Sequence, residues 1–529
     1  MKSLMKRVFA AAAAIATVFG LAATTVATAN AADNATLTVS TTDAKFAGKT
    51  VNAYKMFSAT VSGDGKAVSY TLTDEWKPFF KNSVGLTGVT DENVNDKAND
   101  YVSKLKDSTL VAFATKASNW AQTKANNITA DATATVSADA SNGKYTATFT
   151  GLGYGYYVVA VPGATLANAK SQYATLVSVH STKVDADIKG DLPTVDKKVQ
   201  VDGTGKDATD AKIGDTLTFT LTSTIPDMSA YDTYTFNFKD TLSKGLTFGQ
   251  VKSVKVENVT LTENTDYTVT TPTASNNNTL TVAMKDFKTK QQANAGKKIT
   301  VTYTATLNEN AVVGGAGNVN SAKIQYSNNP STNGTGESEP SKVRVFTYGF
   351  TVDKYTGDQY TDAATRLAGA EFTLAHKDGS AISFVQVSAG SATANAVYRV
   401  AKAGETGTTT ITTPANGKVV FEGLENGEYT LTETKAPAGY NKLASAIGVK
   451  VNGSNDGTDT TNATVNITYN NDNNDTTYDQ TASNGVIPVQ NKSGAILPGT
   501  GGMGTIAFTV IGVLVIALGV AWTLKRKNA

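Results

Sequence analysis

Short segments in which polar and apolar residues alternate recur through most of this 529-residue chain. Residues 216–222 read Thr-Leu-Thr-Phe-Thr-Leu-Thr, and residues 298–306 read Lys-Ile-Thr-Val-Thr-Tyr-Thr-Ala-Thr. Because successive side chains of a strand point to opposite faces, such segments place one face in a core and the other in water. Clusters of Asn, Gly and Asp separate them, and no strand–helix–strand spacing is visible. The pattern predicts an all-β chain of tandem immunoglobulin-like β-sandwich domains.

One stretch departs from this alternation. Between residues 96 and 118, four apolar residues recur at roughly helical spacing: Tyr101, Leu105, Leu110 and Phe113. This spacing is compatible with a helix near the start of the chain, whereas the remainder is expected to form strands and turns.

The composition excludes several classes of function. The 47 Lys and Arg residues nearly balance the 45 Asp and Glu residues, so no nucleic-acid partner is expected. The absence of cysteine excludes disulfides, thiolate metal sites and a cysteine nucleophile. The two histidines, His180 and His376, are far apart, and no recognisable nucleophile motif supports a hydrolase. We therefore expect no enzyme, no metal site and no cofactor.

The first 31 residues have the features of a secretory signal peptide. Lys2, Lys6 and Arg7 form a charged start, and an Ala-rich apolar run follows from Val8. Ala29-Asn30-Ala31 then offers a cleavage site with small residues at its two ends. We expect cleavage after Ala31, because the apolar run is too weakly hydrophobic for a membrane anchor.

The C-terminal end has the features of a membrane-spanning segment. Residues 506–524 are mostly apolar and long enough to cross ~30 Å of hydrocarbon as a helix. Lys525-Arg526-Lys527 follow at once, and such a basic cluster stays on the cytoplasmic side. A transient membrane anchor is therefore expected.

The sequence Leu497-Pro498-Gly499-Thr500-Gly501 stands just before this apolar span. The arrangement resembles the LPXTG cell-wall sorting signal of Gram-positive surface proteins, and the alternative is a chance match beside an ordinary single-pass anchor. The resemblance implies that a sortase cleaves between Thr500 and Gly501 and passes Thr500 to an amine. The mature protein would then be secreted and covalently anchored to the cell wall.

Between the two ends, composition and turn signals suggest three modules. The boundaries are a first module over residues 32–189, a middle module over 190–342 and a third module over 343–496. The signal peptide (1–31) precedes them, and the sorting signal (497–529) follows them.

The third module carries the most specific pattern. Phe350-Thr-Val-Asp-Lys354 opens it, Tyr429-Thr-Leu-Thr-Glu433 follows, and Val489-Gln-Asn491 closes it. This set resembles the Cna B-type domain of Gram-positive adhesins and pilins. The resemblance implies an intramolecular isopeptide bond from Lys354 to Asn491, assisted by Glu433. Burial favours the neutral amine that the attack on the amide requires, and it would keep Glu433 protonated so that it polarises the Asn491 carbonyl.

The middle module has a looser version of the same pattern. Val195-Asp-Lys197-Lys198-Val199 opens it, Phe238-Lys-Asp240 follows, and Asn318-Val-Asn320 stands near its end. This set resembles the middle domain of backbone pilins, which implies a bond from Lys197 to Asn320 assisted by Asp240. Alternation places Lys197, rather than Lys198, on the inner face with its apolar neighbours. Asn318 and Asn320 share one strand face, so alternation does not choose between them, and the resemblance favours Asn320.

The first module resembles the N-terminal pilin domain through Val51-Asn-Ala-Tyr-Lys55-Met-Phe57 and the Gly/Tyr-rich residues 151–157. No set of Lys, acid and Asn stands out in it, although Lys45, Lys49 and Lys55 are available as amines.

In backbone pilins, a lysine at the junction of the first and second domains accepts the activated threonine of the next subunit, often within a Tyr-Pro-Lys motif. No such tripeptide occurs in this chain. Lys189 lies at the matching junction and is flanked by acids, so we expect it to be the polymerisation lysine. Lys198 and Lys183 are the alternatives.

The resemblance as a whole implies the structural backbone subunit of a sortase-assembled pilus that supports adhesion. Pilus-specific and housekeeping sortases, identical subunits joined covalently, minor pilins and peptidoglycan are the implied partners, and a host or extracellular-matrix ligand is a further one. A wall-anchored monomeric adhesin or a pilus-base subunit is the alternative.

Overall fold

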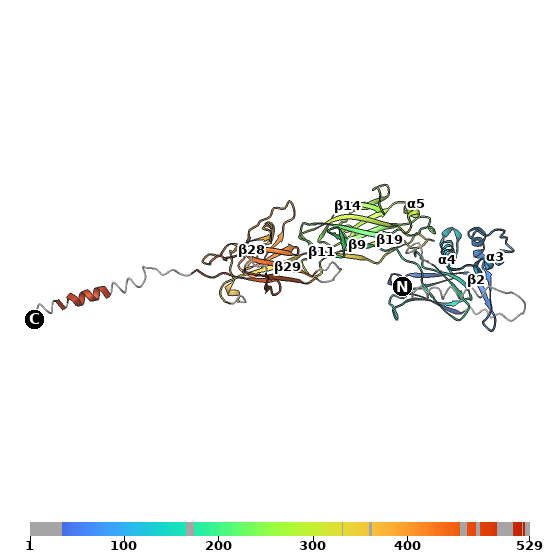
Figure 1. The fold of residues 1–529 in the computed structure, drawn as a ribbon, viewed down its shortest axis with the longest axis horizontal. Helices are drawn as coiled ribbons and strands as arrows, with labels where there is room; N and C mark the ends of the chain where they lie inside the picture. The colour runs from blue at the N-terminus through green and yellow to red at the C-terminus, as the bar shows by residue number, and fades with distance from the viewer. Residues whose placement is uncertain are drawn as a thin grey trace.

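The computed structural model of the chain describes residues 34–165, 174–330, 332–358, 362–454, 463–471, 477–494, 511–520 and 522–523. Three bodies, rich in strands, follow one another along the long axis of the molecule (Figure 1). The expected tandem β-sandwich fold is confirmed. The expected signal peptide and the Leu497–Gly501 motif lie outside the described residues.

The first body contains two sheets. One has the strand order β5-β1-β8, and the other has the order β3-β2-β6-β7 with β4 paired to β2. The parallel pairing of β8 with β1 joins the end of the body to its beginning. The strands are β1 (Ala35–Thr41), β2 (Thr50–Val61), β3 (Val68–Leu72), β4 (Ala132–Thr135), β5 (Tyr145–Leu152), β6 (Gly155–Ala160), β7 (Ala174–Val179) and β8 (Lys183–Asp187).

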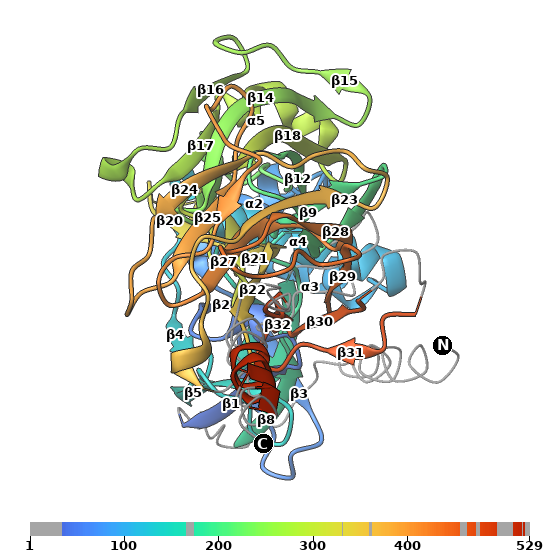
Figure 2. The ribbon, with the colours of Figure 1, turned by 90° about the vertical axis from the view of Figure 1, so that its left-hand side faces the viewer.

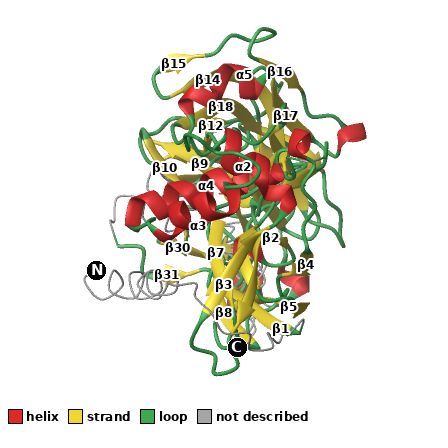
Figure 3. Ribbon diagram, turned by 90° about the vertical axis from the view of Figure 1, so that its right-hand side faces the viewer, coloured by secondary structure: helices red, strands yellow, loops and turns green. Residues whose placement is uncertain are grey.

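Helices cover one side of the larger sheet of the first body (Figure 3). The apolar spacing between residues 96 and 118 comes from two helices, since the first helix ends at Ser103 and the second begins at Asp107. The rings of Tyr101 in the first helix and Phe113 in the second pack together, with their centroids 5.8 Å apart. The helical segments are α2 (Lys77–Asn82), α3 (Val94–Ser103) and α4 (Asp107–Gln122), with 3-10 turns η1 (Ala44–Phe46), η2 (Asp74–Trp76) and η3 (Lys124–Asn126).

The middle body is a sandwich of two sheets, with strand orders β10-β9-β12-β18-β14-β15 and β11-β21-β19-β13-β17-β16; β20 pairs with β19. The Thr-rich segment of residues 216–222 forms part of β12, which pairs in antiparallel register with β18. The strands are β9 (Asp196–Val201), β10 (Thr204–Lys206), β11 (Ala208–Asp210), β12 (Thr216–Thr224), β13 (Phe236–Leu242), β14 (Leu246–Val256), β15 (Val259–Thr260), β16 (Tyr267–Thr270), β17 (Thr279–Met284), β18 (Lys298–Leu307), β19 (Asn318–Ser327), β20 (Thr335–Glu337) and β21 (Ser341–Phe346).

Short helical segments complete the middle body, namely η4 (Ala274–Asn276), α5 (Phe287–Gln291) and η5 (Gln292–Asn294). The expected boundary between residues 342 and 343 falls inside β21. Because this strand pairs with β19, we assign it to the middle body, which then ends at Phe346.

The third body is also a sandwich, with strand orders β24-β25-β27-β22-β32 and β26-β23-β28-β29-β30-β31. Its first strand and its last strand are parallel neighbours, and both are labelled in the end-on view of Figure 2. The elements are β22 (Tyr348–Tyr355), η6 (Ala363–Thr365), β23 (Glu371–His376), β24 (Phe384–Ser388), β25 (Ala396–Val400), β26 (Ile411–Thr412), β27 (Lys418–Leu424), β28 (Gly427–Lys435), β29 (Ile447–Gly453), β30 (Val465–Tyr469), β31 (Gln480–Thr481) and β32 (Val486–Gln490).

The middle and third bodies meet through close backbone contacts. The Ile213 N–H donates to the Gly423 carbonyl at 3.0 Å, and the Asp210 carboxylate accepts from the Asn426 backbone N–H at 2.7 Å. Gly423 has φ +84°, and a Cβ added there would lie 2.6 Å from the Ile213 Cδ1 atom. With isoleucine at position 213, the contact therefore requires glycine at position 423.

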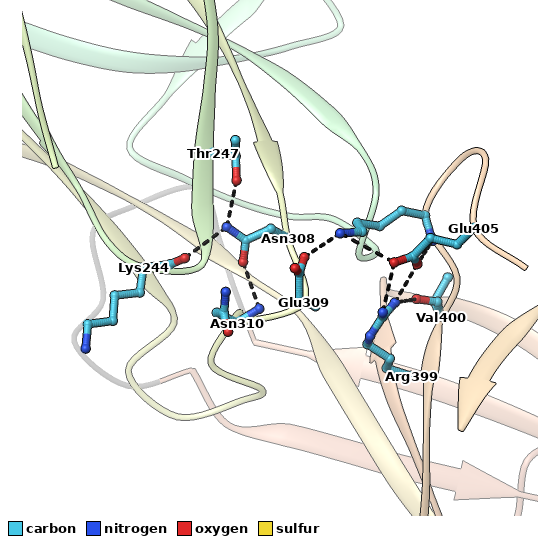
Figure 4. A network of polar contacts seen from close by, with 9 residues as sticks. Lys244, Thr247, Asn308, Glu309, Asn310, Arg399, Val400 and Glu405 are labelled. Atoms are coloured by element: carbon cyan, nitrogen blue, oxygen red, sulfur yellow. Dashed lines mark hydrogen bonds and ion pairs between the residues drawn. The ribbon is translucent and has the colours of Figure 1, made fainter. Parts of the chain in front are cut away.

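An ionic network crosses the same joint (Figure 4). Glu309 of the middle body accepts from Lys402 of the third body at 2.5 Å. Arg399 binds Glu405 through two nitrogens at 2.7 and 2.9 Å, and Lys402 lies 3.5 Å from the same carboxylate. These cations lower the pKa of Glu405 to about 2. Lys402 thus pairs with Glu309 of the middle body and with Glu405 of the third body.

Beyond the third body, residues 511–520 are helical. Among the residues that the structure describes, no helix reaches the length and apolarity needed to cross a membrane. The expected span over residues 506–524 includes residues outside that set.

Gly423→Ala tests the steric contact at the joint. We expect the free energy of unfolding of the chain to fall by about 1–3 kcal/mol from the backbone strain at positive φ alone, and by more because of the overlap with Ile213. Chemical denaturation measures the change. Gly379→Ala is the matched control, because Gly379 has φ +89° and nothing lies within 4 Å of its added Cβ. Equal losses in the two variants would contradict the steric contact.

Candidate functional site: two buried clusters of lysine, carboxyl and asparagine

The three residues singled out in the third module lie together inside its sandwich. Lys354 belongs to β22, Glu433 to β28, and Asn491 follows directly after β32. The parallel pairing of β22 with β32 places Lys354 opposite Val489, and the Asn491 N–H donates to the Tyr355 carbonyl at 2.9 Å. Strands from both sheets therefore contribute to one buried cluster, which we call the third-module cluster.

Contacts within the third-module cluster join all three residues. The Lys354 Nζ atom lies 3.2 Å from Glu433 Oε1, and neither side chain is exposed. The Asn491 Nδ2 atom donates to Glu433 Oε2 at 3.0 Å and to the Asn441 carbonyl at 2.9 Å. The carboxyl group therefore bridges the amine and the amide.

Burial controls the charge of the lysine in this cluster. Lys354 is buried, and its Nζ atom lies 5.8 Å from the centroid of the Phe372 ring. Loss of hydration lowers the pKa of Lys354 to about 8, although the Glu433 carboxylate opposes the shift. At pH 7 about one amine in ten is then neutral, compared with about one in three thousand at the ordinary pKa.

Asp353, the residue before Lys354 on β22, is not its partner. Asp353 is itself buried, and its carboxylate lies 2.6 Å from Arg366 Nε and 3.7 Å from Lys418 Nζ. These two cations cover the Asp353 carboxylate. Burial raises the pKa of Asp353, and both cations oppose the shift.

The middle module contains a second buried cluster, which we call the middle cluster. Lys197 from β9, Asp240 from β13 and Asn320 from β19 are all unexposed. Lys198, the next residue on β9, is partly exposed and binds Asp207 at 2.6 Å. Alternation therefore predicted correctly which of the two lysines faces the interior.

A tyrosine completes the middle cluster. The Lys197 ammonium contacts Asp240 Oδ2 directly and lies 2.9 Å from the Tyr303 hydroxyl. The hydroxyl donates to Asp240 Oδ2 at 2.6 Å and accepts from Asn320 Nδ2 at 2.6 Å. Tyr303 is not among the site residues predicted from the sequence. Its only signal was an inward position on the alternating segment of residues 298–306, where any apolar core residue would serve equally well.

Asn318 and Asn320 differ in their partners, which separates two residues that alternation could not. Asn318 Nδ2 donates to the Val345 carbonyl at 3.1 Å, and its Oδ1 accepts from the Val312 N–H at 2.9 Å. Asn318 therefore satisfies backbone groups, whereas Asn320 contacts the Tyr303 hydroxyl of the middle cluster.

Burial also lowers the pKa of Lys197 to about 8, against the opposing effect of Asp240. The Lys197 Nζ atom lies 5.1 Å from the ring centroids of both Phe219 and Tyr303. Burial in this apolar setting, with Asp240 nearby, raises the pKa of the Tyr303 hydroxyl well above its usual value, so that it stays protonated.

The expected polymerisation lysine lies in the connection between the first and middle bodies. Lys189 follows β8, and its Nζ atom lies 3.2 Å from Asp187 with the side chain 32% exposed. Lys183, one alternative, is exposed on β8, and Lys198, the other, pairs with Asp207. The Lys189 ammonium is therefore accessible from solvent.

The lysines of the first body have other partners. Lys45 contacts Asp191 and lies 3.2 Å from Asp43. The Lys55 Nζ atom lies 5.6 Å from the centroid of the Tyr157 ring. Among the described residues of the first body, these contacts do not bring a lysine and an asparagine to one buried carboxylate.

Comparison with known proteins finds two matching family models. Residues 213–330 match the Gram-positive pilin backbone subunit 2, Cna-B-like domain. Residues 358–468 match the SpaA prealbumin-like fold domain. These segments fall in the middle and third bodies, which contain the two clusters.

Individual relatives are more distant. The trypsin-resistant surface T6 protein of Streptococcus pyogenes serotype M6 is 26% identical over 279 residues, which cover 48% of this chain and 44% of that protein. The match therefore spans less than half the length of that relative.

Solved structures with a similar fold include two pilins. The T6 backbone pilin of S. pyogenes shares 18% identity over 87% of this chain and 99% of that chain, with a TM-score of 0.46. The major pilin SpaD of Corynebacterium diphtheriae shares 20% identity over 88% and 98%, with a TM-score of 0.40. The two family models thus identify a Gram-positive pilin backbone Cna-B-like domain in the middle body and a SpaA prealbumin-like domain in the third body.

Proposed function

We propose that this chain is the structural backbone subunit of a sortase-assembled, covalently polymerised Gram-positive pilus that supports adhesion. The observation that carries the proposal is the pair of buried clusters, each of which joins a lysine to a carboxyl group and an asparagine. They lie in the two bodies that match family models. The chain acts as a scaffold, and its own chemistry is a single self-processing step rather than turnover.

Each cluster would form one intramolecular isopeptide bond. In the third module the neutral Lys354 amine attacks the Cγ atom of Asn491, the Cγ–Nδ2 bond breaks, and ammonia leaves. Glu433 contacts both groups, so it can hand a proton from the amine to the leaving nitrogen. In the middle module the corresponding residues are Lys197, Asn320 and Asp240.

The fold supports this chemistry by holding the two reactants together. Positioning of this kind removes ~7–11 kcal/mol of activation free energy in favourable cases. The resulting amide closes a loop of more than a hundred residues, which on the loop model for disulfides stabilises the fold by about 4–5 kcal/mol. An amide also resists reduction, which suits an extracellular chain without cysteine.

The bonds would also carry tension along a fibre. If the chain is linked through Lys189 and Thr500, the force passes through β9 and β19 in the middle body and through the parallel strands β22 and β32 in the third. The bonds from Lys197 to Asn320 and from Lys354 to Asn491 would then bypass the residues between them. The first body lies upstream of Lys189 and does not need such a bond.

The partners follow from this role. Identical subunits, minor pilins, sortases and peptidoglycan would be covalent partners, and a host or extracellular-matrix ligand would be a noncovalent one. A wall-anchored monomeric adhesin or a pilus-base subunit is the alternative and would carry the same two clusters. The state of the protein on the cell surface separates these roles.

The intact mass of the chain tests the two bonds. We expect the wild-type protein to be lighter than its sequence by two ammonia molecules, since each bond releases one. Asn320→Ala and Asn491→Ala should each lose only one ammonia, and peptide mapping should find the remaining bond in the unaltered module. Asn318→Ala is the matched control and should still lose two, because Asn318 binds backbone groups. A wild-type mass equal to that of the sequence would overturn the proposal.

The pH dependence of bond formation tests the role of the neutral amines. Since burial lowers the pKa of both lysines to about 8, the neutral fraction falls about tenfold for each pH unit below 8. We expect the rate after release from denaturant to rise between about pH 6 and pH 8 and then to level off. Intact mass in quenched samples measures it. A rate that keeps rising to pH 10 would mean that the lysines react with their ordinary pKa.

Polymerisation through Lys189 is tested on whole cells. We expect wall extracts to show a ladder of high-mass species on a denaturing gel, and Lys189→Ala to abolish it while leaving both intramolecular bonds intact. Lys183→Ala and Lys198→Ala are the comparison variants. A single band from the wild type would favour the monomeric adhesin, and loss of the ladder only in one comparison variant would move the assignment to that lysine.

A further inference from the structure

The Tyr303 hydroxyl occupies the centre of the middle cluster. It accepts a hydrogen bond from Lys197 Nζ at 2.9 Å and another from Asn320 Nδ2 at 2.6 Å. It donates to Asp240 Oδ2 at 2.6 Å. One oxygen atom therefore touches the attacking nitrogen, the leaving nitrogen and the assisting carboxylate of the proposed reaction.

Packing fixes the position of this hydroxyl. Tyr303 lies on β18, the strand that pairs with both β12 and β14, and the residue is unexposed. Its ring stacks on Phe219 with centroids 5.3 Å apart and an interplanar angle of 18°, and Phe248 lies 6.1 Å away. Because the ring is held on both sides, rotation of the O–H bond is the freedom that remains.

The third-module cluster has a different arrangement. There the carboxyl group of Glu433 contacts both reactants directly, at 3.2 Å from Lys354 Nζ and 3.0 Å from Asn491 Nδ2. That amine lies 5.8 Å from the ring centroid of Phe372, which has no hydroxyl. In the middle cluster, the hydrogen bond of Asn320 Nδ2 goes to Tyr303 instead of Asp240. The two clusters thus differ in what connects the carboxyl group to the leaving nitrogen.

We propose that Tyr303 is a further catalytic residue of the middle module, which relays a proton from the Lys197 amine to the Asn320 leaving nitrogen; this inference rests on the proposed function. The neutral Nζ atom attacks Cγ, and the carbonyl electron pair moves to Oδ1. Nζ then gives a proton to the Tyr303 oxygen as Tyr303 gives its own proton to Nδ2. The carbonyl re-forms, the Cγ–Nδ2 bond breaks, and ammonia leaves, so that Tyr303 ends unchanged.

Two further observations fit this relay. Asp240 Oδ1 and Asn320 Oδ1 are buried and accept no hydrogen bond from any residue that the structure describes. Within the described part of the chain, no other donor therefore holds the carbonyl oxygen of the amide that is attacked. In addition, burial keeps the Tyr303 hydroxyl protonated, so that it has a proton to give.

Tyr303→Phe in the full chain tests the relay, since it removes the hydroxyl and keeps the ring that stacks on Phe219. After release from denaturant, we expect the middle bond to form about 10²-fold more slowly, which is the lower end of the range for general acid–base catalysis. The third-module bond should form at the wild-type rate in the same molecules, and peptide mapping of timed samples follows both. Tyr231→Phe is the matched control, because that buried hydroxyl donates to the Ser327 carbonyl at 3.2 Å instead.

The outcomes separate this inference from the proposed function. A wild-type chain that forms no bond overturns the proposed function itself. A wild-type chain and a Tyr303→Phe chain that form the middle bond at equal rates overturn only the relay. A slow middle bond in Tyr303→Phe could also come from loss of folding, and Asn320→Ala is the reference for this. Asn320→Ala lacks the middle bond because it has no amide for Lys197 to attack. If Tyr303→Phe is more sensitive to protease than Asn320→Ala, the hydroxyl has a structural role and the catalytic assignment is wrong.

Discussion

The burial of two lysine side chains is the constraint on which the middle and third bodies depend. A buried ammonium is costly unless it is paired or loses its charge. In this chain both lysines are unexposed, each faces a carboxyl group, and loss of hydration lowers the pKa of each to about 8. The surrounding strands exclude water from both amines, and the free energy lost with the hydration of the ammonium shifts each lysine toward its neutral form.

The same constraint explains why the clusters draw on both sheets. A lysine on one strand reaches the interior only if the opposite sheet supplies polar partners, since the rest of the core is apolar. In the middle body, β9 supplies the lysine, and β13 and β19 of the other sheet supply the carboxyl group and the asparagine. Asp240 Oδ1 and Asn320 Oδ1 accept no hydrogen bond from the residues that the structure describes, so this polar network is not fully satisfied. Buried polar groups without a partner occur at catalytic sites.

Much of the fold and part of the site could be predicted from local sequence. Alternation identified the strands and separated Lys197 from Lys198, because inward and outward positions follow from a period of two. The partners of each lysine came from resemblance, since they lie on strands far along the chain. Tyr303 was missed because its hydroxyl contacts residues of three other strands, and nothing near it in sequence shows these contacts. The burial of Asp353 had no local signal, because the cations that cover it, Arg366 and Lys418, lie further along the chain.

The contact between Ile213 and Gly423 bears on how such proteins diversify. Genes for modular surface proteins can exchange whole domains by recombination, and a crossover near Thr347 would separate the middle body from the third cleanly. A donor whose third body had any side chain at position 423 would collide with Ile213. A third body with a side chain at position 423 would therefore fit only a middle body with a smaller residue at position 213, so the two modules are compatible as a pair and not singly.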